Sequence, residues 1–206
     1  MSDFIDSFEN KRKKNAAGII FDVILDIVIV VLVAVVVAHM AFTPVMVEGE
    51  SMNDTLYDGE HVLISNWDRN FSVGDIVVLK KDNYNIIKRI VAVSGDKIAF
   101  LRNADGTVDL YRNDFTNPVK EAFLKEPMIN TLKFYSTPIA TNADELLSEA
   151  YMITVGQGQI FVMGDNRNNS DDSRKNGCME ISAVKGKMVT VLSGNGFLSL
   201  VFGTLQ

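Results

Sequence analysis

Two short segments of the chain contain residue types that a hydrolase could use together. Ser51 follows Gly49 and Glu50 after an apolar stretch, and Lys88 lies in the largely apolar run Ile86–Val91. A serine becomes a nucleophile only when a base removes its proton, and a lysine can be that base if its surroundings keep the amine neutral. Because no arrangement of the Ser-His-Asp kind is evident, the pair predicts a serine-lysine hydrolase. Taken alone, the serine is weak evidence, because most serines in such settings are turn residues.

The surroundings of Lys88 decide whether it could serve as a base. In a half-buried strand alternate residues share one face, so Ile86, Lys88 and Ile90 would point the same way. Apolar surroundings remove the hydration of the ammonium group and lower the lysine pKa, as a general base near neutral pH requires. The alternative is a surface lysine on an edge strand that extends its ammonium to water. For an isolated lysine, the alternative is the commoner case.

An unusually polar segment, Gly164–Arg174, follows the apolar run Ile160–Met163. Its Asn, Asp, Ser and Gly residues are turn formers, so a plain loop is one interpretation. Its acids and arginines can also lock one another through bidentate ion pairs. The second interpretation predicts a network that could orient a catalytic amine.

One segment near the start is apolar enough to cross a membrane. Ile27–Ala38 has no polar side chain, and Ala16–Phe42 is long enough to span ~30 Å of hydrocarbon at about 1.5 Å per residue of helix. Because lipid offers the backbone no hydrogen-bond partner, the segment is expected to be helical. The alternatives are a cleaved signal peptide, whose apolar core is usually about 7–15 residues, and a buried core helix. The length of the uninterrupted run argues against both, so we predict a permanent anchor at 16–42.

Charged residues around this span predict its orientation. The basic block Lys11–Lys14 precedes it, which places residues 1–15 in the cytoplasm and residues 43–206 outside, on a single-pass protein of the cell membrane. Asp22 and Asp26 are four residues apart and share one helix face. They indicate either the cytoplasmic interface of the span or a polar contact with a partner helix.

Composition excludes several classes of function. After residue 42 the chain has 16 basic and 21 acidic residues, so an acidic domain has no electrostatic reason to bind nucleic acid. The single cysteine, Cys178, permits no intramolecular disulfide, and we expect it to be a small buried side chain. With only His39 and His61 besides it, a metal-binding cluster is not expected. We expect His61 to be a strand residue, and we expect no metal and no cofactor.

The remainder of the chain reads as mainly β, with short apolar runs separated by Gly-Asp, Asp-Gly and Asn-rich turns. Residues 100–157 are more polar and are expected to form an inserted small lobe, with a short helix within Ala143–Tyr151. The expected strands outside that lobe are Val45–Glu48, His61–Ser65, Ile76–Lys80, Ile86–Ser94, Ile160–Met163 and Lys187–Leu192.

Four of these segments together resemble the motifs of one family. In order and spacing, Glu48–Leu56, Gly74–Val78, Ile87–Val91 with Gly95-Asp96, and Gly164–Arg174 are similar to those of the bacterial type I signal peptidases. The resemblance covers most of residues 16–192, with 100–157 poorly matched. It implies a signal-peptidase-like β-barrel catalytic domain behind one transmembrane helix. It also implies a membrane-bound serine endopeptidase that cleaves N-terminal signal peptides from exported preproteins.

The resemblance implies a role for each residue that matches a family motif. Ser51 would be the nucleophile and Lys88 the general base, while Ser170 would orient the lysine amine. Asp172 and Arg174 would form a supporting salt bridge, and Asp165 and Arg167 would brace the same region. Residues near the nucleophile that would contact substrate, chiefly by lining a pocket for small side chains, are Val47, Met52, Leu56, Ile86 and Ile87. The implied partners are preprotein signal peptides and the lipid bilayer, and the sequence identifies no protein partner.

The chain departs from the family pattern at three positions. Asp54 and Ser94 stand where the family usually has proline, which leaves local rigidity open. Gly49 stands where some members have a hydroxyl that helps bind the oxyanion, so backbone N–H groups, chiefly that of Ser51, would have to serve. Two other functions compete: a soluble, self-cleaving repressor-type protease, and an anchored binding protein with a decayed site. The span argues against the first, and the presence of both Ser51 and Lys88 argues against the second.

Overall fold

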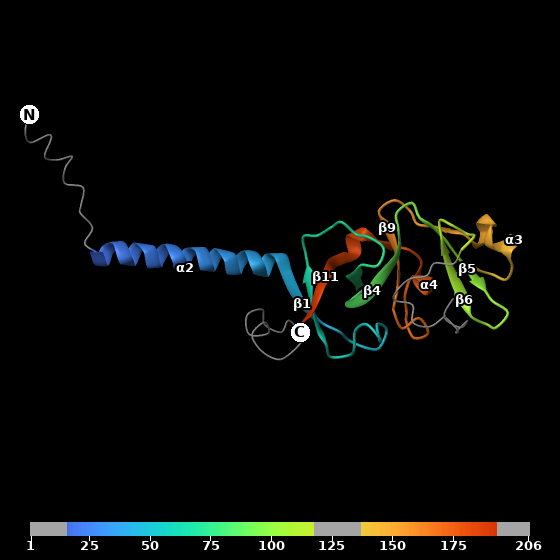
Figure 1. The fold of residues 1–206 in the computed structure, drawn as a ribbon, viewed down its shortest axis with the longest axis horizontal. Coiled ribbons are helices and arrows are strands. Elements are labelled where there is room, and N and C mark those ends of the chain that lie inside the picture. The colour runs from blue at the N-terminus through green and yellow to red at the C-terminus, as the bar shows by residue number, and fades with distance from the viewer. Residues whose placement is uncertain (1–15, 118–136, 193–206) are drawn as a thin grey trace, which may run out of the picture. The chain divides into compact units, whose positions relative to one another are not determined.

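The computed structural model describes residues 16–117 and 137–192, and the chain divides into two compact units after Ala41 (Figure 1). The first unit contains the helix α2 (Ala16–Ala41), whose 26 residues turn their large apolar side chains outward. Its stretch Gly18–Ala41 is long and apolar enough to cross a membrane. The expected N-terminal apolar helix is therefore confirmed, although Phe42 begins a strand instead of ending the helix. The basic block Lys11–Lys14 lies outside the described residues.

The second unit is built on a seven-stranded sheet in which every adjacent pair is antiparallel. This confirms the mainly β class. In spatial order the strands are β1 (Phe42–Met46), β2 (His61–Ser65), β11 (Val184–Leu192), β3 (Ile76–Lys81), β4 (Tyr84–Val93), β9 (Gln159–Met163) and β10 (Met179–Glu180).

A second, smaller sheet is inserted in the chain between β4 and β9, and Figure 1 shows it beyond β4 and β9 at one end of the unit. Its strands are β5 (Lys97–Arg102), β6 (Val108–Arg112), β7 (Ile139–Ala140) and β8 (Ile153–Thr154), and β5 pairs with the other three. This sheet is the expected inserted small lobe, and it begins a few residues earlier than position 100.

The helix expected at Ala143–Tyr151 is interrupted. It forms as α3 (Ala143–Leu146) followed by a 3-10 turn, η2 (Glu149–Tyr151). Asn142 caps the first with its side chain, and Ser148, whose backbone is extended, caps the second. The Ser148 side chain accepts a hydrogen bond from the Ala150 amide, at the start of η2. Because the Ser148 backbone is extended, α3 cannot continue through it.

Strand β4 is more deeply buried than a half-buried strand would be. It lies between β3 and β9, and every residue from Ile87 to Ala92 is buried. Ile90 packs into one apolar cluster with Val77, while Ile87 packs into another with Val78, so the expected alternation of faces holds. Because both faces are covered, a charged side chain on β4 loses its water whichever way it points.

The first strand ends at Met46, two residues earlier than expected, because the chain turns at Gly49. β1 pairs with β2 from Phe42 to Met46, whereas the prediction was Val45–Glu48. Gly49 has φ +83°, a conformation that glycine adopts without strain, and its amide donates to the Asp58 carboxylate at 2.7 Å. His61 begins β2, which confirms the expected strand there, and Cys178 packs partly buried against the core cluster around Phe161.

Two short elements complete the described part of the second unit. They are α4 (Ser173–Asn176) and the 3-10 turn η3 (Ile181–Ala183). The first of them ends the polar segment Gly164–Arg174 and brings it back against β9, because the Ser173 hydroxyl accepts a hydrogen bond from the Val162 amide at 3.0 Å. The loop that follows β9 is therefore anchored at both ends.

Candidate active site

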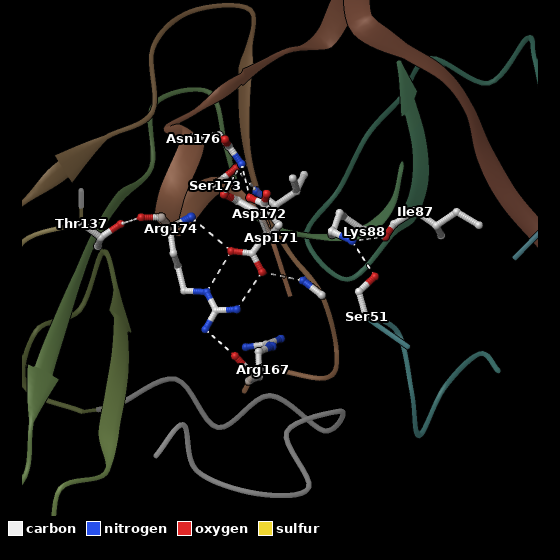
Figure 2. Close-up of polar contacts among 12 residues, drawn as sticks. Ser51, Ile87, Lys88, Thr137, Arg167, Asp171, Asp172, Ser173, Arg174 and Asn176 are labelled. Atoms are coloured by element: carbon white, nitrogen blue, oxygen red, sulfur yellow. Dashed lines mark hydrogen bonds and ion pairs between the residues drawn. The ribbon is translucent and has the colours of Figure 1, made fainter. Parts of the chain in front are cut away.

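Ser51 and Lys88 meet in the structure. Lys88 Nζ lies 2.6 Å from Ser51 Oγ, within hydrogen-bond distance, and it also donates to the Ile87 carbonyl at 3.0 Å. Figure 2 shows the lysine side chain reaching from β4 toward the serine, with both contacts drawn. Because Ile87 directly precedes Lys88 on β4, the second contact holds Lys88 Nζ close to its own strand. A serine hydroxyl and a lysine amine held at this distance can exchange a proton.

Burial sets the acidity of this amine. The Lys88 side chain is 4% exposed, and desolvation lowers its pKa from 10.5 to about 8. The carboxylates of Asp172 and Asp171 act in the opposite direction, and Lys81 and Arg174 assist the lowering. Desolvation is the largest of these effects, so a substantial fraction of the amine is neutral at mildly alkaline pH.

The chain around Ser51 forms a tight turn that the polar loop holds from one side. Within the turn, the Met52 carbonyl accepts hydrogen bonds from the Thr55 and Leu56 amides at 3.0 and 2.8 Å. Asn166 holds the turn from outside, because its amide donates to the Ser51 carbonyl at 3.1 Å and its side chain to the Glu50 carbonyl at 3.0 Å. Sequence reasoning assigned no role to Asn166, since an asparagine in a polar loop carries no signal of its own.

The backbone at Asp54 explains one departure from the family pattern. Asp54 has φ +77°, whereas the ring of a proline fixes φ near about −65°. A proline at this position is therefore incompatible with the turn observed here. The turn keeps its shape through the contacts of its neighbours instead of through a rigid ring.

Asp165 connects a residue near Ser51 in the chain to the residue that follows Lys88. Its carboxylate accepts a hydrogen bond from Thr55 Oγ1 at 2.6 Å and forms a bidentate pair with Arg89, whose Nε lies 2.8 Å away. Arg89 also donates to the Gly74 carbonyl at 2.7 Å. The prediction for Asp165 was a bracing contact. Its two hydrogen-bond partners, Thr55 and Arg89, were not predicted from the sequence. The signal for Arg89 was available, because a second basic residue beside Lys88 in a buried strand needs a partner.

Asp172 and Arg174 form an ion pair (Figure 2), and both residues are buried, each 1% exposed. Arg174 Nε and Nη2 each lie 2.8 Å from an Asp172 oxygen, and the Gly164 amide donates to the same carboxylate at 3.0 Å. Burial by itself raises the pKa of the Asp172 carboxyl, but the hydrogen bonds and charge of Arg174 outweigh it, and the pKa lies below its ordinary value. Arg174 also donates from Nη1 to the Arg167 carbonyl at 2.6 Å.

Ser170 lies close to both the turn that contains Ser51 and the buried ion pair, yet it does not bond Lys88 in this structure. Its hydroxyl is buried and completes no hydrogen bond of ordinary geometry within the described residues, but it lies close enough to Asp172 to help lower the pKa of that carboxyl. The close approach depends on Gly164, because a Cβ at that position would lie 2.3 Å from both the Ser51 carbonyl oxygen and Ser170 Oγ. Only a residue without a side chain allows these three segments to converge.

Four of the five residues expected to contact substrate come together. Val47, Met52, Leu56 and Ile87 belong to one buried apolar cluster, in which Met52 directly follows Ser51 and Ile87 directly precedes Lys88. Ile86 packs against a different cluster with Val77 and Leu79, because it points to the other face of β4.

One known family matches most of the sequence. The model of the family described as "Signal peptidase, peptidase S26" matches residues 20–193. Signal peptidase I U of Bacillus subtilis (strain 168) is 35% identical over 138 residues, which are 65% of this chain and 65% of that protein. Signal peptidase I P of Bacillus subtilis subsp. natto is 33% identical over 175 residues, which are 81% of this chain and 83% of that protein.

Among solved structures, a signal peptidase I from Enterococcus faecalis V583 is 27% identical and aligns over 58% of this chain and 97% of that one, with a TM-score of 0.40. The alignment to the first Bacillus subtilis relative spans slightly less than two thirds of its length. Because the family model matches well over half of the sequence, this chain belongs to the signal peptidase family, peptidase S26.

Proposed function

We propose that this protein is a membrane-bound serine endopeptidase that removes N-terminal signal peptides from exported preproteins. The observation that carries the proposal is the 2.6 Å contact between Ser51 Oγ and a buried Lys88 amine of lowered pKa. The relatives named Signal peptidase I support the choice of substrate. A decayed binding protein would have no need to keep a buried, desolvated lysine against a serine hydroxyl.

In the proposed mechanism Ser51 is the nucleophile and Lys88 the general base. The neutral amine takes the hydroxyl proton as Ser51 Oγ bonds to the scissile carbonyl carbon, and the resulting ammonium gives that proton to the departing amine of the mature protein. Water, with Lys88 again as base, then hydrolyses the acyl-enzyme. Because the neutral amine is the active form, the rate rises with pH through the Lys88 pKa and levels off above it. The backbone amide of Ser51 would stabilise the oxyanion.

The supporting residues act on this pair at different distances. We assign Ser170 to orienting the Lys88 amine once its hydroxyl turns from Asp172 toward that amine, since the hydroxyl is buried beside the Ser51 carbonyl. The Asp172–Arg174 pair fixes the backbone that precedes Ser170, through the Gly164 amide and the Arg167 carbonyl. Asp165 couples the turn of Ser51 to the strand of Lys88.

The substrate has an unpaired strand edge on which to lie. β4 pairs with β9 only from Arg89 onward, so its residues Asn85–Lys88 have no partner on that side within the described ranges. β1 likewise pairs with β2 alone among the described strands. An extended peptide could add to these edges through main-chain hydrogen bonds, as in β-strand addition, and this would bring a peptide bond toward Ser51.

Cleavage specificity tests the proposed function. The full chain in detergent micelles is expected to cleave a preprotein peptide containing Ala-x-Ala. Cleavage is expected to be roughly 100-fold or more slower when the residue before the bond is Phe. The reason is that the proposed pocket residues leave little volume there: Val47, Met52, Leu56 and Ile87. Liquid chromatography with mass spectrometry measures both rate and bond. The Ser51→Ala protein is the control for contaminating proteases. Equal rates for Ala and Phe would contradict the proposed pocket.

We also propose that α2 anchors the protein, with residues 1–15 in the cytoplasm and the β-rich residues 43–206 outside it. The basic block at Lys11–Lys14 supports this orientation. Protease added to intact protoplasts is expected to degrade residues 43–206 and to leave a cytoplasmic marker protein untouched. Protection of residues 43–206 until the membrane is broken would reverse the topology and remove the proposed substrate.

A further inference from the structure

Asp171 lies between two residues with assigned roles, Ser170 and Asp172, but its own side chain is engaged elsewhere. Its carboxylate accepts a hydrogen bond from Asn176 Nδ2 at 2.8 Å and pairs with Lys175 Nζ at 3.1 Å. It also pairs with Lys81 Nζ at 3.6 Å. The first two partners belong to the adjacent helix α4, whereas Lys81 lies at the end of β3, so this third contact joins two distant parts of the chain.

The position of Lys81 links that contact to the base. Lys81 is the last residue of β3 and pairs with Tyr84, the first residue of β4, and Lys88 follows on the same strand. The ion pair therefore joins the β3–β4 hairpin, which carries Lys88, to the Gly164–Arg174 loop, which carries Ser170. The Lys81 side chain is only 17% exposed, so its charge is partly desolvated. Both charges reach Lys88, and they act on its pKa in opposite directions.

We propose that Lys81 and Asp171 are positioning residues of this site, whose ion pair holds the hairpin against the loop and balances two opposite charges near Lys88. The proposal rests on the proposed function, in which Lys88 is the base. With the pair intact, the two charges act on the Lys88 amine in opposite directions, and burial has the largest effect on its acidity. When either Lys81 or Asp171 is removed, the charge of the other acts on the Lys88 amine without its counter-charge.

Two further charged groups act on Lys88, Asp172 from the loop and Arg174 from α4. They are bound to each other in the buried ion pair described above, whereas Lys81 and Asp171 form a separate pair nearer the surface. A change confined to Lys81 or Asp171 therefore leaves the buried pair in place. This separation allows the contribution of the outer pair to be measured.

The test compares Asp171→Asn, Lys81→Gln and the double variant with the parent protein, each as the full chain in detergent micelles. Two quantities are followed with pH: kcat/KM for the Ala-x-Ala peptide, and the 13Cε chemical shift of Lys88, assigned from the missing signal in Lys88→Met. The parent is expected to titrate near pH 8. Asp171→Asn leaves Lys81 uncompensated, which disfavours the ammonium and lowers the midpoint; Lys81→Gln does the reverse.

The expected shifts are on the order of half a pH unit in each direction, the effect of a unit charge several ångströms away in partly aqueous surroundings. The double variant is expected to return close to the parent midpoint. Raising salt from about 0.1 M to about 1 M is expected to shrink both shifts, since the Debye length falls from roughly 10 Å to 3 Å. Lys175→Gln is the matched control, because it also removes an ion pair to Asp171, yet Lys175 is not among the groups with the largest effects on the Lys88 pKa.

The outcomes separate this inference from the proposed function. A parent Lys88 that titrates near the roughly 10.4 of free lysine would overturn the proposed base itself. A depressed Lys88 midpoint that neither single variant moves would overturn only the role of the ion pair. Slower cleavage with unchanged midpoints would likewise reduce Lys81 and Asp171 to structural contacts. Opposite shifts that cancel in the double variant support the proposal.

Discussion

Replacing Ser51 by alanine, or Lys88 by methionine, is expected to lower kcat/KM for preprotein cleavage by roughly 10⁴-fold or more. The two side chains share one short contact, and the proposed covalent pathway needs both, so losing either should remove nearly all of the activity. The double variant is then expected to be no slower than the worse single variant. Cleavage of a preprotein substrate by the purified full-length variants, at a pH above 8, measures this.

Matched controls separate lost chemistry from lost structure. Ser72→Ala and Lys80→Met alter an exposed serine and an exposed lysine of the same domain, and we expect both to keep parental rates. Circular dichroism and thermal unfolding should show that the Ser51 and Lys88 variants remain folded. The Lys88→Met protein should lose no stability below pH 8, because it no longer buries an ammonium group. A folded Ser51→Ala protein with more than a few per cent of parental activity would refute the nucleophile assignment.

Replacing Asp172 by alanine is expected to destabilise the β-rich domain by about 3–5 kcal/mol, because it leaves the buried Arg174 guanidinium without its counter-charge. It also removes the acceptor for the Gly164 amide and the side-chain cap of α4. Cleavage should fall as the folded fraction falls. It should also be slower than in the parent at temperatures where almost all of the protein is folded, since the loop carrying Ser170 loses its support. Urea unfolding monitored by the single tryptophan, Trp67, measures the first effect.

Two comparisons test whether the unpaired charge is the cause. Exchanging both partners, Asp172→Leu with Arg174→Met, removes the ion pair without leaving a lone buried charge and is expected to cost less than Asp172→Ala. Lys175→Ala removes the half-exposed pair with Asp171 and is expected to change the unfolding free energy by less than about 1 kcal/mol. If Lys175→Ala costs as much as Asp172→Ala, the burial argument fails.

Local patterns were sufficient for the elements whose physics is local. The helix at Ala16–Ala41 follows from a long, largely apolar segment, because in lipid such a segment can satisfy its backbone hydrogen bonds only as a helix. The strands His61–Ser65 and Ile76–Lys81 were predicted to within a residue, because turn residues bound them closely. The boundaries of β1 and the interruption after Leu146 were missed, since they depend on strand register and on the side-chain caps at Asn142 and Ser148.

The sequence by itself determined the chemical inventory of the site: a serine, a lysine in an apolar run, and a polar segment of acids and arginines in a recognisable order. Only the tertiary structure decided how these residues meet. Three sets of contacts join segments that are far apart in the chain. They are the contact between Ser51 and Lys88, the hydrogen bonds of Asp165 with Thr55 and Arg89, and the ion pair of Lys81 with Asp171. Periodicity cannot reveal such pairings, because it reports which face a side chain occupies and not what packs against that face. The same limit applies to the pKa of Lys88, which is lowered because the packing around its side chain removes its water.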